Sequence, residues 1–360
     1  MQTSLPWRNA VCRAWSGERD RSCRCSSARK EGRCAHRDFV GIGGSLGAVD
    51  ALRQLCRELP ADLPAAILVV VHTHAGGPNY LADSIGSASA LPVGTASDGE
   101  PVRPGRVYVA PADHHMLLMD GVVRLGRGPR ENTARPAIDP LFRSLGVCCG
   151  PRAVGVILTG TLNDGAAGLS DLKRCGGVTL VQNPADASAA EMPLSARRAS
   201  EIDYRATIVD MPELLTHLVR EKAGAAPAVP PEVLLEAEIA LGRSMDDRTA
   251  MKLGSPVPLS CPCCGGVLNE MERSSPLRFR CQVGHAYTAE ALANEQEGSV
   301  DEAVRVALRI IQERVVLTER MVQEARRNGR NATANILDSR LKEYQEHADL
   351  LRKAALRETA

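Results

Sequence analysis

A serine in a glycine-rich turn is the first feature of the chain that could do chemistry. Residues 39–48 read FVGIGGSLGA, so an apolar run leads through a turn to Ser45 and then into a helical pattern. Glycine turns sharply without a Cβ clash, and the N–H groups at the start of the following helix favour negative charge beside the serine. These conditions suit an acyl-transfer nucleophile. On this segment alone, Ser45 could also be a helix N-cap.

A histidine and an aspartate follow two further apolar runs. His72 comes directly after the run at 66–71, and Asp164 lies in a glycine-rich loop after the run at 153–159. The carboxyl ends of parallel strands meet at one edge of an open sheet, so we expect these side chains to lie near Ser45. A hydroxyl, an imidazole and a carboxylate in one place predict a Ser–His–Asp catalytic triad. Taken singly, a structural histidine and a helix-capping aspartate are equally compatible with the sequence.

The same glycine-rich turn also resembles a dinucleotide-binding turn. Gly47, however, breaks the G-x-G-x-x-G spacing, and no acidic residue ends the second apolar run, where His72 stands instead. The hydrolase interpretation is therefore the stronger one.

The elements that must position these residues begin at residue 38, where short apolar runs start to alternate with amphipathic stretches. Several runs are apolar on both faces, which is typical of parallel strands covered by helices. The alternation predicts an α/β fold with a doubly wound, mostly parallel sheet. The expected strands are 39–43, 66–71, 107–110, 122–125, 153–159, 178–182 and 206–209, and the expected helices are 47–59, 79–87, 140–149, 166–175, 186–199 and 212–221.

Residues 38–222 resemble the catalytic domain of the chemotaxis protein-glutamate methylesterases, the CheB type. The resemblance rests on many ordered matches that extend over this whole region. They are GIGGSLG at 41–47, Val71-His72, DGEPVRPG at 98–105, VYVAPADHH at 107–115, RPAIDPLF at 135–142, GVILTGTLNDGAAG at 155–168, Gln182-Asn183 and Met192-Pro193.

The resemblance implies a role for each residue of the predicted site. Ser45 would attack the γ-glutamyl methyl ester of a chemoreceptor or related sensory protein, His72 would be the general base, and Asp164 would orient the imidazole. The backbone N–H groups of Leu46 and Thr161 would form the oxyanion hole. The resemblance also implies deamidation of receptor glutamines, and it implies no cofactor for catalysis.

The sequence departs from the family pattern in two places beside the nucleophile. Leu46 stands where the family usually has threonine, and Ala48 replaces a glycine. Because the oxyanion donor is a backbone N–H group, Leu46 should preserve it, and we expect the bulk of its side chain to narrow the pocket.

Residues 1–37 are rich in Arg, Ser and Cys and show no apolar periodicity. We expect a disordered leader, which leaves no room for the receiver domain that usually precedes this catalytic domain, so regulation would come from elsewhere. A metal site is the alternative for this segment, and its ligands would be Cys12, Cys23, Cys25 and Cys34.

A second motif combines three cysteines with a histidine. Cys261, Cys264, Cys281 and His285 follow the spacing C-x2-C-x16-C-x3-H, which is typical of one tetrahedral zinc ion. Four protein ligands leave no open coordination position, so we expect a structural role for the zinc. Two alternatives stay open: Cys263 competes as a ligand, and the cysteines could be free thiols in a reduced domain.

The region after the catalytic domain is predicted to have three parts. A linker with a short helix covers 223–256, a zinc-ribbon-like unit covers 257–290, and an α-helical hairpin covers 298–357 with a break near 328–331. The hairpin pattern has one apolar stripe, which favours packing on itself or dimerisation. We expect it to dock a separate receiver or signalling partner in place of the missing receiver domain.

Composition excludes several other classes of function. The net charge is +1, so no overall field attracts nucleic acid, and no apolar run has the roughly 20 residues of a membrane helix. The 12 cysteines do not form a regular disulfide framework, and no signal peptide is evident, which predicts a cytoplasmic protein. The alternative function is a regulatory binding module with a methylesterase fold and little catalysis, but the joint presence of Ser45, His72 and Asp164 favours the enzyme.

Overall fold

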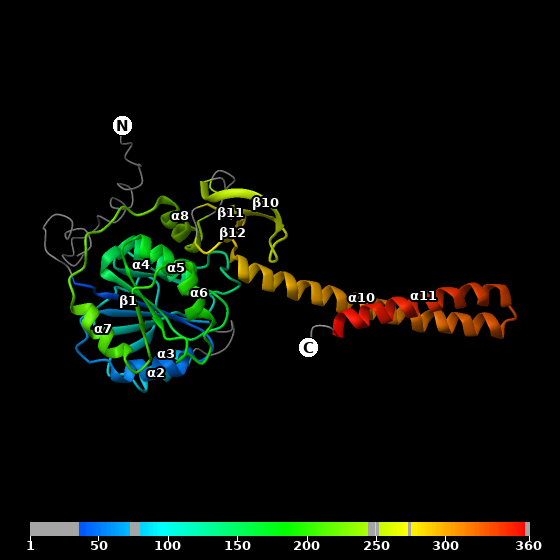
Figure 1. The fold of residues 1–360 in the computed structure, drawn as a ribbon, viewed down its shortest axis with the longest axis horizontal. Helices are drawn as coiled ribbons and strands as arrows, with labels where there is room; N and C mark the ends of the chain where they lie inside the picture. The colour runs from blue at the N-terminus through cyan, green and yellow to red at the C-terminus, as the bar shows by residue number, and fades with distance from the viewer. Residues whose placement is uncertain (1–35, 73–79, 244–248, 250–251, 273–274, 357–360) are drawn as a thin grey trace. The chain divides into compact units, whose positions relative to one another are not determined.

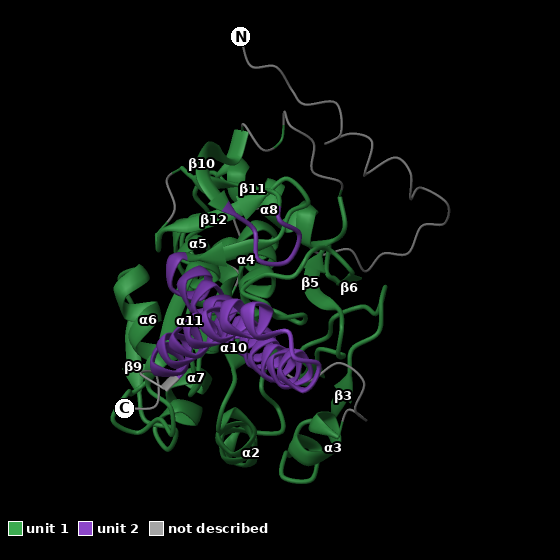
Figure 2. Ribbon diagram, turned by 90° about the vertical axis from the view of Figure 1, so that its right-hand side faces the viewer, with its two compact units in different colours: residues 1–259, 266–288 green, residues 260–265, 289–360 purple. Residues whose placement is uncertain are grey.

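The computed structural model describes residues 36–72, 80–243, 249, 252–272 and 275–356 (Figure 1). The predicted leader and its alternative cysteine site lie outside the described residues, apart from the last residues before the first strand. The chain forms two compact units (Figure 2). Unit 1 comprises residues up to 259 together with 266–288, and unit 2 comprises residues 260–265 and 289–360.

A seven-stranded parallel sheet forms the centre of unit 1 and confirms the predicted fold class. Its strand order is β3-β4-β2-β1-β7-β8-β9, and each neighbouring pair is parallel. The strands are β1 (Phe39–Gly44), β2 (Ala66–Val71), β3 (Val93–Thr95), β4 (Arg106–Val109), β7 (Ala153–Ile157), β8 (Val178–Gln182) and β9 (Tyr204–Ala206).

Helices cover both faces of this sheet, as the two-sided apolar strands require. Helices α2, α3 and α7 lie on one face, and α4, α5 and α6 lie on the other (Figure 1). The bounds are α2 (Ala48–Glu58), α3 (Leu81–Gly86), α4 (Ile138–Cys149), α5 (Ala166–Arg174), α6 (Glu191–Ala199) and α7 (Met211–Arg220).

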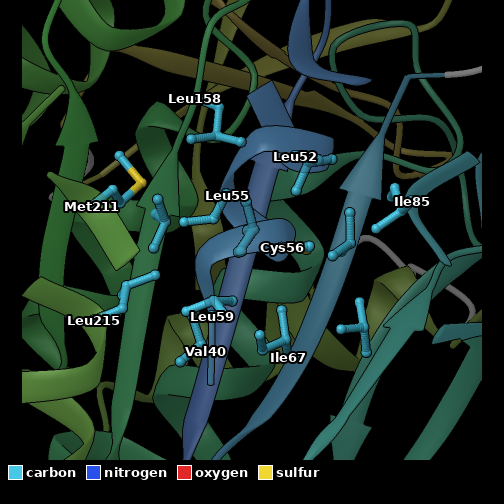
Figure 3. Packing of buried hydrophobic residues seen from close by; sticks show 14 of the residues in the cluster. Val40, Leu52, Leu55, Cys56, Leu59, Ile67, Ile85, Leu158, Met211 and Leu215 are labelled. Carbon is cyan, nitrogen blue, oxygen red and sulfur yellow. The ribbon is translucent and has the colours of Figure 1, made fainter. Parts of the chain in front are cut away.

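The core on the α2 face is built from aliphatic side chains, since the chain has few aromatic residues. Leu52 and Leu55 of α2 are fully buried against Val40 of β1 and Ile67 of β2, and Met211 of α7 closes the cluster (Figure 3). Burying such side chains contributes about 1.5–3 kcal/mol each. This packing fixes the central strands from which the site residues extend.

Strand register places the ends of the three central strands side by side. In the sheet, β1 lies between β2 and β7, with Gly44 opposite Val71 and Gly43 opposite Ile157. The chain leaves β1 towards β2 and returns on the other side at β7, so β1 lies at the topological switch point, where ligands bind in open α/β sheets. The residues that follow these strand ends are therefore brought to one rim.

Several elements differ from the expectation. Strand β3 and strand β5 (His115–Met119) were not expected, and β5 pairs with β6 (Val122–Gly126) as a separate antiparallel hairpin. Helix α6 begins at Glu191, five residues later than predicted, because the Asp186 carboxylate accepts hydrogen bonds from the Gln182 side chain and from the Ile208 backbone, which holds the segment as a turn.

Unit 1 continues beyond the catalytic region with a helix and a second sheet. Helix α8 (Pro231–Ala240) packs on α4, with Val233, Glu236 and Ala237 fully buried. The second sheet has four strands in the order β10-β11-β12-β13. They are β10 (Gly254–Ser260), β11 (Val267–Met271), β12 (Arg278–Cys281) and β13 (Ala286–Thr288), and β12 is antiparallel to both β11 and β13.

Unit 2 is dominated by the helical hairpin that the sequence predicts. Helix α10 (Ala289–Arg327) begins nine residues earlier than expected, and α11 (Asn331–Leu356) returns along it after a turn in which Gly329 has a φ of 68°. Glycine adopts this left-handed conformation without penalty. None of the helices in the described part of the chain is both long and apolar enough to cross a lipid bilayer.

Candidate active site

Ser45 lies at the rim of the sheet, immediately after β1. Its backbone N–H donates to the Thr159 carbonyl at 3.0 Å, which joins the loop after β1 to the loop after β7. The residue is half-buried. The hydroxyl makes no hydrogen bond with any described residue. Catalytic hydrogen bonds often tighten only when substrate binds.

His72 and Asp164 form a hydrogen-bonded pair at the same rim. The distance from His72 Nε2 to Asp164 Oδ2 is 2.7 Å. The histidine side chain is 25 % exposed, whereas that of the aspartate is 2 % exposed. Register places His72 in the position beside Ser45, because Gly44 and Val71 pair directly before them. The structure thus brings the predicted imidazole and carboxylate together and places the predicted hydroxyl on the adjacent strand.

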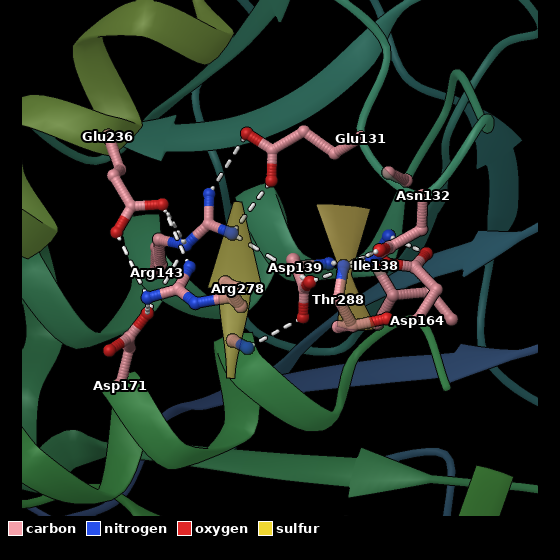
Figure 4. A network of polar contacts seen from close by, with 12 residues as sticks. Glu131, Asn132, Ile138, Asp139, Arg143, Asp164, Asp171, Glu236, Arg278 and Thr288 are labelled. Carbon is pink, nitrogen blue, oxygen red and sulfur yellow. Dashed lines mark hydrogen bonds and ion pairs between the residues drawn. The ribbon is translucent and has the colours of Figure 1, made fainter. Parts of the chain in front are cut away.

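The Asp164 carboxylate is held by a set of donors from another loop. Its Oδ2 atom also accepts from the Ile138 N–H at 2.7 Å, and its Oδ1 atom accepts from the Asn132 side-chain amide at 3.0 Å and from the Asp139 N–H at 3.5 Å (Figure 4). Such donors stabilise a carboxylate and fix its orientation. The carboxylate can therefore orient the imidazole of His72.

The two members of the pair shift each other's ionisation. Burial disfavours both charged forms, but the hydrogen bond and charge of Asp164 outweigh it and raise the pKa of His72 above its usual value. In the same way, the bonds from His72, Ile138 and Asn132 outweigh burial and lower the pKa of Asp164. The neighbouring Asp139 behaves oppositely, since burial and the charge of Asp164 raise its pKa to about 7.

Leu46 and Thr161, whose backbone N–H groups are predicted to form the oxyanion hole, belong to the two loops that meet at Ser45. Leu46 opens the turn before α2, and Thr161 follows Gly160, where an added Cβ atom would lie 3.0 Å from Ser45 Cβ and 1.9 Å from Met192 Sδ. Only glycine therefore lets the two loops approach this closely. No described residue accepts a hydrogen bond from the N–H of Leu46 or Thr161. The Leu46 side chain is 61 % exposed, so its bulk lies towards solvent.

The structure identifies supporting residues to which the sequence assigned no role. Gln182 accepts from the Thr159 N–H at 2.8 Å, and Glu191 accepts from the Leu162 N–H at 2.8 Å, so both hold the loop that carries Thr161. Asn132 contacts Asp164 directly. Gln182 lies in a matching segment of the family resemblance, whereas nothing in the sequence around Asn132 indicates its contact with Asp164.

The four residues predicted to bind zinc also come together. Each of Cys261, Cys264, Cys281 and His285 offers one ligand atom, and these atoms all lie within 4.8 Å of one another. Three sulfur atoms and one imidazole nitrogen at such separations are a donor set that suits tetrahedral zinc. The group can hold a metal ion, whereas the competing Cys263 is exposed and is not part of it.

The open, doubly wound parallel sheet, with a serine and a hydrogen-bonded His–Asp pair at neighbouring carboxyl ends, places the chain in the class of α/β proteins with a candidate site at the switch point. Residues 40–215 match the family CheB methylesterase. The chain therefore contains a CheB methylesterase domain and extends beyond it.

Curated relatives carry the same domain. A "Protein-glutamate methylesterase/protein-glutamine glutaminase 2" of Anaeromyxobacter dehalogenans is 40% identical over 188 residues, which are 52% of this chain and 55% of the relative. A "Protein-glutamate methylesterase/protein-glutamine glutaminase" of Yersinia pestis is 42% identical over 162 residues, or 44% of this chain and 46% of the relative. The chain thus spans about half the length of the curated relatives it matches.

A solved structure also matches about half of the chain. The crystal structure of the Thermotoga maritima CheB methylesterase catalytic domain is 33% identical, with a TM-score of 0.49, and the match covers 51% of this chain and 98% of that one.

Proposed function

We propose that this protein is a serine hydrolase that removes methyl esters from glutamate side chains of chemoreceptors or related sensory proteins, and that it also deamidates their glutamines. The observation that carries the proposal is the 2.7 Å His72–Asp164 hydrogen bond beside Ser45 at the switch point of the sheet. The family match of the same segment supports methyl-ester chemistry.

The proposed reaction has two steps. Because Nε2 of His72 faces Asp164, its Nδ1 takes the Ser45 proton while the serine oxygen attacks the ester carbonyl. The N–H groups of Leu46 and Thr161 stabilise the resulting oxyanion; losing one such donor typically costs about 2.7–4 kcal/mol. The imidazolium protonates the leaving methoxide, which departs as methanol. Water then hydrolyses the acyl-enzyme to the glutamate carboxylate and free Ser45.

Methanol release from a methylated chemoreceptor tests this function directly. The full chain should release methanol and leave receptor glutamates unmethylated, without any added cofactor. The same assay on an unmethylated receptor carrying glutamines should release ammonia. A chain that binds methylated receptor but releases neither product would instead support the regulatory binding module.

We assign a structural zinc ion to Cys261, Cys264, Cys281 and His285, since the donor set fits that metal. Replacing Cys281 with serine should remove stoichiometric zinc and lower the melting temperature by about 5–10 °C, because metal binding and folding of such a site are coupled. Zinc content by atomic absorption and thermal denaturation measure the two effects.

The neighbouring Cys263→Ser is the matched control for the zinc assignment, because Cys263 is exposed and lies outside the cluster. This variant should keep its zinc and its melting temperature. Purified protein without stoichiometric zinc, or an unchanged melting temperature in Cys281→Ser, would contradict the assignment.

The hairpin offers a surface for a signalling partner. Val306, Ile310, Leu317 and Met321 recur at helical spacing along α10 and are 38–59% exposed. Such a stripe favours a partner with a complementary apolar face. Ile310→Glu with Leu317→Glu should abolish copurification of a receiver-domain protein with the full chain, while methanol release is retained. Equal recovery by the natural chain and this variant would exclude docking at the stripe.

We also place this activity in the cytoplasm. The irregular spacing of the cysteines along the sequence, which differs from that of a secreted disulfide framework, supports this placement. The proposed substrate segments of chemoreceptors must then face the same compartment.

A further inference from the structure

Strand β13 of the second sheet runs beside the loop that holds the site carboxylate. The Asn132 N–H donates to the Ala286 carbonyl at 2.8 Å, and the Ala286 N–H donates to the Arg130 carbonyl at 3.2 Å. Glu131 forms a parallel bridge with Ala286. A segment some 150 residues further along the chain thus acts as an extra strand on this loop.

Thr288, the last residue of β13, makes two hydrogen bonds to residues that surround Asp164. Its hydroxyl donates to the Asn163 side-chain oxygen at 2.7 Å, and Asn163 directly precedes Asp164. Its backbone N–H donates to Asn132 Oδ1 at 2.9 Å (Figure 4). Thr288, Asn132 and Asn163 are all nearly inaccessible to solvent. Water therefore cannot replace a hydrogen bond that is lost here.

The bond from Thr288 determines which way the Asn132 amide faces. A side-chain amide has one accepting and one donating end. Because Oδ1 accepts from Thr288, the Nδ2 group must face Asp164 and Asp139, to which it donates at 3.0 and 3.1 Å. The reverse orientation would turn an oxygen towards two carboxylates. Strand β13 therefore selects the orientation that stabilises the Asp164 charge.

Buried ion pairs keep β13 and its neighbour β12 in this place. Arg280 of β12 pairs with Glu131 at 3.0 Å and with Glu236 of α8 at 2.8 Å, and all three side chains are about 99–100% buried. Arg143 of α4 pairs with the same Glu131 at 2.7 Å. Charges desolvated to this degree are held in a single arrangement, because separating them leaves an uncompensated charge.

We infer that Thr288 is a positioning residue for the His72–Asp164 pair, so that the second sheet is a working part of the active site. The inference rests on the proposed function for its activity readout. Thr288 does not touch the reacting atoms; it acts through Asn132 and Asn163 on the Asp164 carboxylate, which in turn orients the imidazole.

Thr288→Val in the full-length protein tests the hydroxyl route, since valine keeps the shape but cannot donate. We expect kcat for methanol release to fall roughly tenfold, the equivalent of one net hydrogen bond, with KM unchanged. The acid limb of the kcat/KM profile should move towards pH 6.5, because a less ordered carboxylate raises the pKa of His72 less. Thr288→Ser should restore both values.

Asn132→Gly tests the amide route. Asn132 has a φ of 47°, and glycine accepts this left-handed backbone without strain, so the variant removes the amide alone. Its kcat should fall at least as far as in Thr288→Val. Combined with Thr288→Val it should lose less than the product of the two single effects, because both residues act on one carboxylate. If the two losses in kcat were fully multiplicative, the two residues would not act through the same carboxylate, and the inference would be overturned.

Two further measurements separate positioning from a general loss of stability. Thr216→Val removes a threonine hydroxyl bond to the Pro212 carbonyl in α7, away from the site, and should leave kcat and the acid limb unchanged. NMR titration of the His72 ring reads its pKa without substrate, so it tests the positioning role even if the natural protein releases no methanol. An unchanged His72 titration in Thr288→Val, with or without a lower melting temperature, would overturn the inference.

Discussion

Replacing Ser45 with alanine should lower methanol release from methylated receptor by roughly four orders of magnitude or more. The alanine variant has no oxygen to form the acyl-enzyme, so only the oxyanion donors and substrate binding remain to accelerate attack by water. Ser45 lies in a turn whose backbone N–H donates to Thr159, and alanine preserves this bond, so the fold should be retained. Steady-state methanol release and receptor binding measure the two properties separately.

Ser87→Ala is the matched control for this prediction. Ser87 is an exposed serine at the end of α3, and its hydroxyl donates only to the Ser84 carbonyl at 2.8 Å. Its activity should equal that of the natural protein. Equal methanol release by Ser45→Ala and the natural chain would exclude Ser45 as the nucleophile and leave the binding-module interpretation in its place.

The central sheet could be predicted well from the sequence, because each of its inner strands is marked by the apolar residues within that strand. The largely apolar segments of β1, β2 and β8 are typical of buried parallel strands, and their predicted bounds agree with the structure to within a residue. The edge elements were less predictable. Strand β3 has three residues and is half exposed, so it has no apolar run to detect, and the Asp186 turn that delays α6 depends on bonds from Gln182 and Ile208.

The site shows the same division between local and distant signals. The positions of Ser45 and His72 could be predicted because each directly follows a strand, and that of Asp164 because it lies in the loop after β7. Parallel strands bring these ends together. Asn132 and Thr288 could not, since their bond joins positions 156 residues apart, and Asn132 carries no motif of its own. The contribution of the second sheet to the site therefore becomes visible only through tertiary contacts.

Asp164→Asn should reduce kcat by roughly 10³–10⁴-fold, the second-largest effect expected for this chain. Asp164 accepts hydrogen bonds from four donors: His72, Ile138, Asn132 and Asp139. An asparagine turns its amide N–H groups towards half of these donors and removes the charge that stabilises the imidazolium. Both changes weaken the base.

The pH profile separates this role from a packing role. His72 must be neutral to accept the Ser45 proton, and its raised pKa means that kcat/KM of the natural protein should rise with pH through a limb centred above 6.5. In Asp164→Asn the attraction between the carboxylate and the protonated His72 ring is lost, while burial still disfavours the charged ring. The acid limb should therefore move to lower pH, although the rate is lower at every pH.

The comparison variant is Asp139→Asn, which alters a buried carboxylate that accepts a hydrogen bond from Asn132 but makes none with His72. Since the pKa of Asp139 is raised to about 7, an amide mimics its protonated form, and we expect a loss below tenfold. The limb should move less than in Asp164→Asn, because the Asp139 charge contributes less than Asp164 to the raised pKa of His72. Equal losses in the two variants, or a limb that stays above 6.5 without the Asp164 charge, would show that Asp164 only packs the core beneath the rim.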